Sequence, residues 1–199
     1  MGKNARTMNR RDKRRQLPQK GFTQPLQGNR LSVARATNVD VHVKACFEIC
    51  RTVRGMTAGA AVRKLEKVLL IDSDRPDIRA KAEAIPYRLG SGNKKRKRSG
   101  PSMVGHRKGG MGPGRYPVKA SRVVIKLLNS AMDNARHQHE DIDAEDMIIT
   151  HIAAHRGTIK RGFMPRARGR ATPKNHYQVN LEIFLEDFTA TDDELEDDF

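Results

Sequence analysis

The chain has 199 residues, of which 39 are Lys or Arg and 23 are Asp or Glu, so its formal net charge at pH 7 is +16. With 37% hydrophobic and 5% aromatic residues it can bury one modest core, which argues against a large enzyme. Its longest uninterrupted aliphatic run, residues 68–71, is far shorter than the roughly 20 residues of a membrane span, so we expect a soluble protein with no membrane partner.

The charge is arranged in blocks. Residues 1–30 hold nine basic residues and one acid, residues 84–132 hold twelve basic residues and no acid, and residues 147–181 add seven basic residues without an acid. Residues 182–199 reverse the sign with nine acids. A bound polyanion relieves repulsion among the basic blocks, and nucleic acid can accept charge from several separate segments. A membrane surface fits less well, because neither basic helix carries Trp or Phe on an apolar face.

The start of the chain and its cysteines bear on location and cofactors. No apolar segment follows the basic start, so we expect no export signal and a cytoplasmic protein. Cys46 and Cys50 are the only cysteines and are not spaced as CxxC, which predicts neither a disulfide framework nor a zinc pair. They lie one helical turn apart on an apolar stripe, where buried thiols are favoured over reactive ones. We expect no cofactor and no metal.

The first third of the chain is expected to form an extension, a strand and two helices. Residues 1–30 are polar and basic, typical of a tail that stays disordered until an anion binds. In residues 31–43, apolar Leu31, Val33 and the later valines alternate with polar residues, which predicts an edge strand. Apolar spacings of three and four predict a short helix over 44–54 that ends at Gly55, and Thr57 is expected to cap a second helix. The core stripe of this second helix is Ala58, Ala61, Val62, Leu65 and Leu69.

The middle of the chain combines a long glycine-rich stretch with a helix. Residues 84–116 contain eight glycines around the run KKRKR, and a loop of this length is expected to be either disordered or shaped by a partner. Pro117 suits the first position of a helix that extends to about His137. The apolar side of this helix is Ala120, Val124, Leu127, Leu128, Ala131 and Ala135, and its basic stripe is Lys119, Arg122 and Lys126.

The last third is predicted to be β, with strands over residues 147–155 and 177–186. In the second strand Tyr177, Val179, Leu181, Ile183 and Leu185 point inward, and Gln178, Asn180, Glu182 and Glu186 point outward. About twenty Gly, Pro and Arg residues between the strands predict a β-hairpin whose tip lies about 30 Å beyond the sheet, at roughly 3.3 Å per residue. An isolated hairpin with almost no apolar face is marginal in water, so this projection requires RNA or DNA around it.

These elements predict an α+β fold, in which a small antiparallel sheet packs on about three helices and carries a long protruding β-hairpin and charged tails. Three regions are expected. Residues 1–30 form the basic extension, residues 31–187 form a single RNA-binding domain with its loop at 84–116 and its hairpin at 147–186, and residues 188–199 form an acidic tail.

The series Arg166, Arg168 and Arg170 is the sharpest signal of function. Alternate residues of an extended ribbon share a face, so these guanidinium groups are expected to line one edge of the hairpin. Arg binds phosphates in a bidentate manner and stacks on bases, which suits a finger within folded RNA. An Arg-rich solvated loop is the alternative interpretation.

Other motifs favour ordinary structural roles. His151 and His155 form HxxxH on a strand and lack the Glu of HExxH, so polar or RNA-facing histidines are favoured over a metalloprotease site. His137 and His139 are expected to interact with the dipole of a helix end rather than with a metal. The segment GGMGPGR does not follow a strand and lacks GK[ST], which argues against a nucleotide-binding loop. The run KKRKR is compatible with a nuclear address, a solvated segment or a phosphate contact.

Three segments together resemble a known family. They are VRGMTAGAAVRKLEKVLL (53–70), GPGRYPVKASRVVIKLLNSAMDNARHQ (112–138) and PRARGRATPKNHYQVNLEIFLE (165–186). Over roughly residues 40–187 the chain is similar to large-subunit ribosomal protein twenty-two, called seventeen in eukaryotes, and its long Gly-rich segment before GRYP resembles archaeal and eukaryotic members. The resemblance implies a small α+β domain on ribosomal RNA, with a long hairpin in the wall of the nascent-peptide exit tunnel. The basic extension and the acidic terminus have no counterpart in the family pattern.

We therefore expect a non-enzymatic structural constituent of the large ribosomal subunit that binds and organises ribosomal RNA. Neighbouring large-subunit proteins, and the nascent peptide near the hairpin tip, are further expected partners. The expected RNA-binding residues are Arg88, Lys94, Lys95, Arg96, Lys97, Arg98, Arg107, Lys108, Arg115, Lys119, Arg122, Lys126, Arg156, Lys160, Arg161, Arg166, Arg168, Arg170 and Lys174.

Two rival functions share some of these features. A DNA-compacting architectural protein also has positive charge and a β-arm, with Met164 and Pro165 as a possible wedge. A nuclease needs clustered carboxylates for a metal, but the acids gather at residues 72–77, at residues 140–146 and in the tail, without an obvious site.

Overall fold

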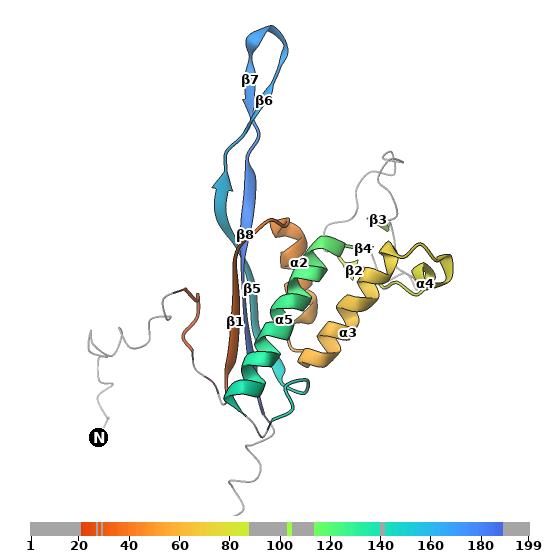
Figure 1. Ribbon diagram of the computed structural model, residues 1–199, viewed down its shortest axis with the longest axis vertical. Helices are drawn as coiled ribbons and strands as arrows, with labels where there is room; N and C mark the ends of the chain where they lie inside the picture. Colours follow the sequence, from red (N-terminus) through yellow and green to blue (C-terminus); the bar gives the residue numbers. More distant parts are fainter. Residues whose placement is uncertain are drawn as a thin grey trace, which may run out of the picture.

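A three-stranded antiparallel sheet in the order β1-β8-β5 organises the protein (Figure 1). Its strands are β1 (Ser32–Val39), β5 (Ile148–Lys160) and β8 (His176–Glu186), and β8, the last strand among the described residues, is central. The structure is a computed structural model and describes residues 21–26, 28, 30–87, 103–104, 114–139 and 142–188.

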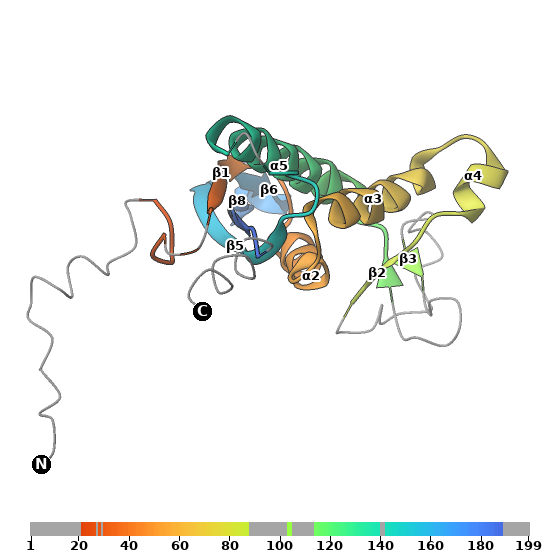
Figure 2. The same cartoon turned by 90° about the horizontal axis from the view of Figure 1, so that it is seen from below.

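Three helices lie on one side of this sheet: α2 (Val43–Val53), α3 (Ala58–Leu69) and α5 (Val118–Gln138). Helix α5 packs over β1 and β8, α2 packs over β5, and α3 packs against α5 (Figure 2). Beside the helices lie several short elements: the 3-10 turn η1 (Leu70–Asp72), α4 (Pro76–Ala80) and a second sheet of β2 (Ile85–Pro86), β4 (Gly114–Arg115) and β3 (Met103–Val104). The predicted α+β fold is confirmed.

Local signals in the sequence set the helix ends. The hydroxyl oxygen of Thr57 accepts a hydrogen bond from the backbone N–H of Ala60 at 3.4 Å, so the predicted cap of α3 is confirmed. Gly55 has a φ of +77°, a conformation that favours glycine, in the turn between α2 and α3. Helix α5 begins at Val118, one residue later than predicted, so Pro117 is its N-cap and not its first residue.

The buried faces of the helices follow the apolar periodicity. All six residues predicted for the apolar side of α5 are buried. In α3, Ala58, Ala61 and Leu65 are buried as predicted. Val62 and Leu69 are only half-buried, and Val68 is buried although it was not predicted. Positions 58, 61, 65 and 68 keep the helical period, and residue 69 lies at the edge of that stripe.

Strand β1 faces the helices with the opposite phase to the predicted one. Its buried residues are Ser32 and Ala34, whereas Leu31 and Val33 are half-buried. The hydroxyl group of Ser32 donates a hydrogen bond to the carbonyl oxygen of Ala131 in α5 at 2.8 Å, which satisfies the buried polar group. Small side chains in β1 therefore face the long helix.

Strand β8 is buried on both of its faces in the core region. Val179, Leu181, Ile183 and Leu185 face the helices and are fully buried, as predicted. Tyr177 is 45% exposed, against prediction, because it lies at the start of β8, where the strand leaves the hairpin and enters the core. Glu182 is only 3% exposed, also against prediction, since residues 21–26 lie on that outer face. The ring of Phe22 packs edge-to-face on Phe184, with 5.5 Å between centroids.

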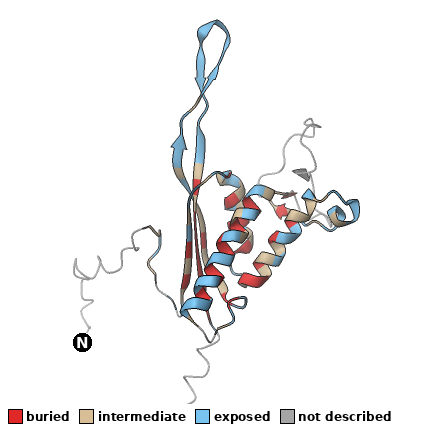
Figure 3. Cartoon of the chain, in the orientation of Figure 1, coloured by how far each residue is buried: buried red, intermediate tan, exposed pale blue. Residues whose placement is uncertain are grey.

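The hairpin continues β5 and β8 far beyond the core (Figure 3). Strands β6 (Phe163–Pro165) and β7 (Ala171–Pro173) pair near its end, and the 3-10 turn η3 (Ala167–Gly169) closes it. Between residues 158 and 177 every residue except Gly162 is exposed. The predicted protruding hairpin is confirmed.

Candidate nucleic-acid interface

The hairpin presents seven basic residues and no acidic residue between positions 155 and 177. All seven are exposed: Arg156, Lys160, Arg161, Arg166, Arg168, Arg170 and Lys174. None of them forms an ion pair with another residue that the structure describes. Their charge is therefore available to an external anion.

The three arginines at the hairpin end do not line one edge, so that prediction is wrong. Arg168 has φ +57° and ψ +38° inside η3, which breaks the alternation of an extended strand. The backbone N–H of Arg166 donates to the carbonyl oxygen of Arg170 at 2.7 Å, and these two residues therefore flank the tip turn. The guanidinium-bearing residues surround the tip instead of forming a row.

A second basic surface lies on α5. Lys119, Arg122 and Lys126 are all exposed and follow helical spacing, as predicted. The Nζ atom of Lys119 lies 3.0 Å from a carboxylate oxygen of Asp40, and a guanidinium nitrogen of Arg122 lies 2.6 Å from one of Asp72. Every side chain in these two pairs is more than half exposed, so the pairs contribute little stability and leave the cations accessible.

Arg115 occupies a different environment from the other predicted residues. It lies in β4, with its guanidinium group 5.0 Å from the centroid of the Tyr87 ring. Its Nε atom is buried and has no hydrogen-bond partner among the described residues. The other eight predicted RNA-binding residues lie outside the described residues: Arg88, Lys94, Lys95, Arg96, Lys97, Arg98, Arg107 and Lys108.

A groove of about 540 Å³ lies at the root of the hairpin. It is lined by the connection from β1 to α2, by Lys119 at the start of α5, and by both strands of the hairpin. Of its Lys, Arg and His residues, Lys119 and Arg156 were predicted from the sequence, whereas His42, Lys44 and His176 were not. Two of them sit at the start of α2, and only the folded chain brings that helix end beside the hairpin.

Comparison with known proteins identifies the family of this chain. A family model described as "Ribosomal protein L22p/L17e" matches residues 34–186. The chain belongs to this family. Curated relatives named "Large ribosomal subunit protein uL22" include one from Methanococcoides burtonii, 34% identical over 164 residues that cover 82% of this chain and 94% of the relative. A relative from Aeropyrum pernix is 35% identical over 176 residues, covering 85% and 98%, and one from Methanocaldococcus jannaschii is 36% identical over 168 residues, covering 82% and 93%.

Membership of the L22p/L17e family confirms the resemblance inferred from the sequence. It makes the chain a structural component of the large ribosomal subunit, in the cytoplasm, and not an enzyme. The DNA-compacting and nuclease alternatives are therefore set aside. Within the part of the chain that the structure describes, no helix is long and apolar enough to cross a membrane, and no group of His, Cys, Asp or Glu is arranged to hold a metal ion.

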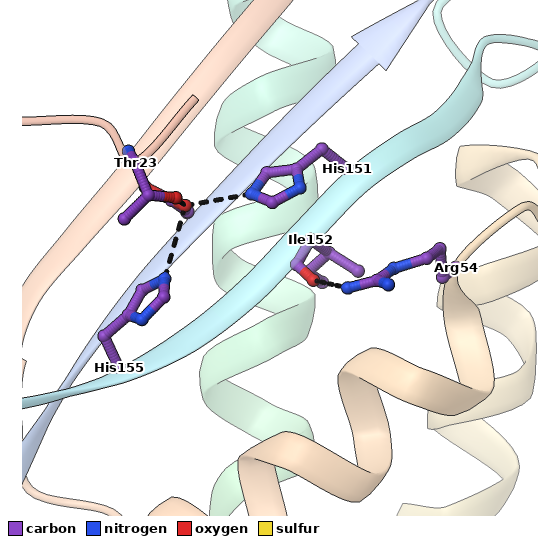
Figure 4. A network of polar contacts seen from close by, with 6 residues as sticks. Thr23, Arg54, His151, Ile152 and His155 are labelled. Carbon is purple, nitrogen blue, oxygen red and sulfur yellow. Dashed lines mark hydrogen bonds and ion pairs between the residues drawn. The ribbon is translucent and has the colours of Figure 1, made fainter. Parts of the chain in front are cut away.

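In this L22p/L17e protein the histidines of the HxxxH pair have a structural role (Figure 4). The Nε2 atoms of His151 and His155 lie 2.9 Å and 3.4 Å from the same carboxylate oxygen of Glu182, and the backbone N–H of Thr23 donates to the other oxygen at 3.1 Å. Burial by itself raises the pKa of Glu182, but hydrogen bonds from Thr23 and His151 outweigh it, so the pKa is lower than usual. These are polar, hydrogen-bonded histidines, as the sequence favoured.

The cysteines are also structural. Both are buried in α2 as predicted, and burial raises the pKa of Cys46 to about 11 and that of Cys50 to about 12. Neither thiol is ionised at neutral pH, so neither is a reactive nucleophile.

Proposed function

We propose that this L22p/L17e protein binds and organises large-subunit ribosomal RNA, and that its hairpin lines the nascent-peptide exit tunnel. One observation carries the proposal. The hairpin is a long two-stranded projection whose residues 158–177 are exposed almost without exception, and its charged residues in that stretch are all basic. Such a projection has no apolar core of its own, and an RNA wall around it supplies the missing contacts.

The basic surfaces divide the RNA contacts between two parts of the molecule. The α5 surface (Lys119, Arg122 and Lys126) lies on the globular domain, and the hairpin residues lie well beyond it. Neutralising phosphates on both surfaces releases counterions from two regions of RNA at once, which strengthens the binding of an RNA that reaches both surfaces. The predicted residues of the glycine-rich segment (Arg88, Lys94, Lys95, Arg96, Lys97, Arg98, Arg107 and Lys108) are proposed to extend this interface.

The end of the hairpin combines positive charge with exposed apolar side chains. Phe163 is 75% exposed and Met164 is 43% exposed, beside the arginines that surround the tip turn. Arginines hold RNA, whereas exposed Phe and Met offer an apolar surface to a passing peptide or to a neighbouring protein. This combination of basic and apolar side chains supports a position of the hairpin end at the tunnel wall, in contact with both RNA and the nascent peptide.

The remaining parts of the chain complete the proposal. Residues 31–187 act as a single RNA-binding domain, between a basic extension at 1–30 and an acidic tail at 188–199. The acidic tail repels RNA, so we do not expect it to take part in the RNA interface.

Site-specific photocrosslinking tests the proposal. A photoreactive amino acid replaces Met164 in the full chain, the protein is assembled into large subunits, and ribosomes are stalled with a labelled nascent peptide. The expected result is a crosslink to the peptide and to ribosomal RNA from position 164, but no peptide crosslink from the exposed control position Glu66 on α3. Absence of RNA crosslinks at position 164 in assembled subunits would overturn the placement of the hairpin.

A further inference from the structure

We propose that the groove at the hairpin root binds one unstacked nucleotide of RNA, with its phosphate beside Lys44 and Lys119 and its base on the paired side chains of Tyr177 and Arg156. This inference rests on the proposed function, because it specifies how RNA is held at one place. The groove would recognise an unpaired base, whereas the α5 surface and the rest of the hairpin are proposed to contact phosphates.

The groove has the position and size of a site. It lies on the face of the sheet that the helices cover, where β5 and β8 leave the core, because Arg156 pairs with the inward-facing Val179. Its volume of about 540 Å³ falls within the roughly 300–1,000 Å³ of small-ligand sites. The β1–α2 connection, α5 and the hairpin all contribute to its walls.

The charge of the groove fits a phosphate. Lys44, Lys119 and Arg156 line it together with His42 and His176, and its only acid among the lining residues is Asp40. Asp40 is bound by Lys119 at 3.0 Å, and this contact, aided by Lys160 and His176, lowers the pKa of Asp40. In the free protein one carboxylate thus sits where several cations converge, and a phosphate group can take over its contacts.

The helix starts at the groove point to an anion as well. Lys44 and Lys119 are each the second residue of their helix, and neither α2 nor α5 has an acid in its first turn. Positive charge opposes the dipole at a helix N-terminus. An external anion beside both lysines would balance their positive charge and the positive ends of the two helix dipoles. No acid in the first turn of either helix does this.

An aromatic platform occupies the other wall. The guanidinium group of Arg156 lies 5.5 Å from the centroid of the Tyr177 ring, and Tyr177 is 45% exposed although Val179, two residues on, is fully buried. Unstacked RNA bases stack on aromatic rings and on guanidinium planes, whereas bases within a duplex are already stacked. The platform therefore favours a single-stranded nucleotide over a base pair.

Binding of a short single-stranded oligoribonucleotide and of a duplex of equal length to the full chain tests this site. We expect Tyr177→Leu to weaken binding of the single strand roughly 5- to 150-fold, from the loss of one stacked base, while Tyr177→Phe retains most of the affinity. Binding of the duplex should stay within a factor of two for both variants. Phe47→Leu is the matched control, since Phe47 is 55% exposed on α2 and does not line the groove.

Charge variants of the groove should change the affinity for the single strand in opposite directions. We expect Asp40→Asn to strengthen single-strand binding several-fold more than Asp77→Asn, which removes the same charge from α4. Lys44→Gln should weaken it more than the control Lys81→Gln, which changes an exposed lysine outside the groove.

The outcomes separate the two proposals. Equal losses for single strand and duplex in Tyr177→Leu, or equal gains in Asp40→Asn and Asp77→Asn, would overturn the nucleotide site while binding of ribosomal RNA by the full chain stands. Failure of the unaltered full chain to bind ribosomal RNA at moderate salt would instead overturn the proposed function itself. Thermal melting of each variant alone shows whether it is folded, and the comparison of Asp40→Asn with Asp77→Asn decides the test if Tyr177→Leu is unstable.

Discussion

The Nε2 atom of His151 and a carboxylate oxygen of Glu182 lie 2.9 Å apart on adjacent strands of the sheet, beneath a cover formed by residues 21–26. Glu182 is central to this arrangement because it also accepts hydrogen bonds from Thr23 and contacts His155. The buried carboxylate of Glu182 thus binds the segment 21–26 to β8 and holds it over the outer face of the sheet.

The first prediction concerns pH. The folded-state pKa of Glu182 is below its ordinary value of 4.5, so its contribution to stability is present above pH 4.5 and is lost as pH falls further toward the folded-state pKa. Glu182→Gln should therefore show a smaller loss of unfolding free energy on acidification than the parent. Urea unfolding followed by circular dichroism over this pH range measures it. The control Glu66→Gln, exposed on α3, should behave as the parent does, and an unchanged slope in Glu182→Gln would contradict the prediction.

The second prediction concerns the core. Leu128 is fully buried in α5, so Leu128→Ala should lower the free energy of unfolding by roughly 2–5 kcal/mol through lost packing and a cavity. Denaturant unfolding of the isolated protein measures this change. At temperatures below its melting temperature, where the variant is still folded, its affinity for RNA should remain close to that of the parent.

The third prediction concerns the hairpin tip. Changing Arg166, Arg168 and Arg170 together to Ala should leave the unfolding free energy within about 0.5 kcal/mol of the parent, because all three are exposed and far from the core. Incorporation into large subunits, or protection of tunnel RNA from chemical probes, should fall. A much lower melting temperature in the triple variant, or full incorporation with full protection, would show that core and hairpin do not divide these tasks.

The fourth prediction concerns salt. The logarithm of the RNA-binding constant should fall steeply and linearly with the logarithm of salt concentration, and Lys126→Ala should reduce that slope by a little under one unit. Lys126 is chosen because it forms no ion pair with the described residues, so its removal frees no acid. The control Lys67→Ala removes a lysine that pairs with Glu83 at 3.4 Å, and it should change the slope less. Binding that is indifferent to salt would contradict an electrostatic interface.

Elements with a strong local pattern were predictable from the sequence. The apolar side of α5 repeats over about four turns, and β8 alternates through four buried aliphatic residues, so the spacing of apolar residues was enough to assign each element. The protruding hairpin followed from a long Gly- and Arg-rich segment between two strands. These features depend on residues close together in the chain.

The mistakes have tertiary or turn-specific causes. Ser32 is buried because a carbonyl in α5, 99 residues away, accepts its hydroxyl hydrogen bond. Glu182 is buried because Thr23, 159 residues away, caps it, and no local pattern carries that contact. Arg168 leaves the predicted row because the chain reverses there with a left-handed residue. The groove at the hairpin root was not predicted because its walls come from three segments that are distant in the sequence and meet only in the folded chain.

The pairing of β5 with β8 has a consequence for the direction of the hairpin. The two strands pair from Ile148 opposite Glu186 to Lys160 opposite His176, and the register shifts between Ile149 and His151 and again between Arg156 and Ile159. At each shift β5 holds one residue more than β8, and an extra residue in one strand bends a ribbon and increases its local twist. The second shift lies where the hairpin leaves the core. The angle at which the whole projection leaves the domain is therefore set by a few residues at its root.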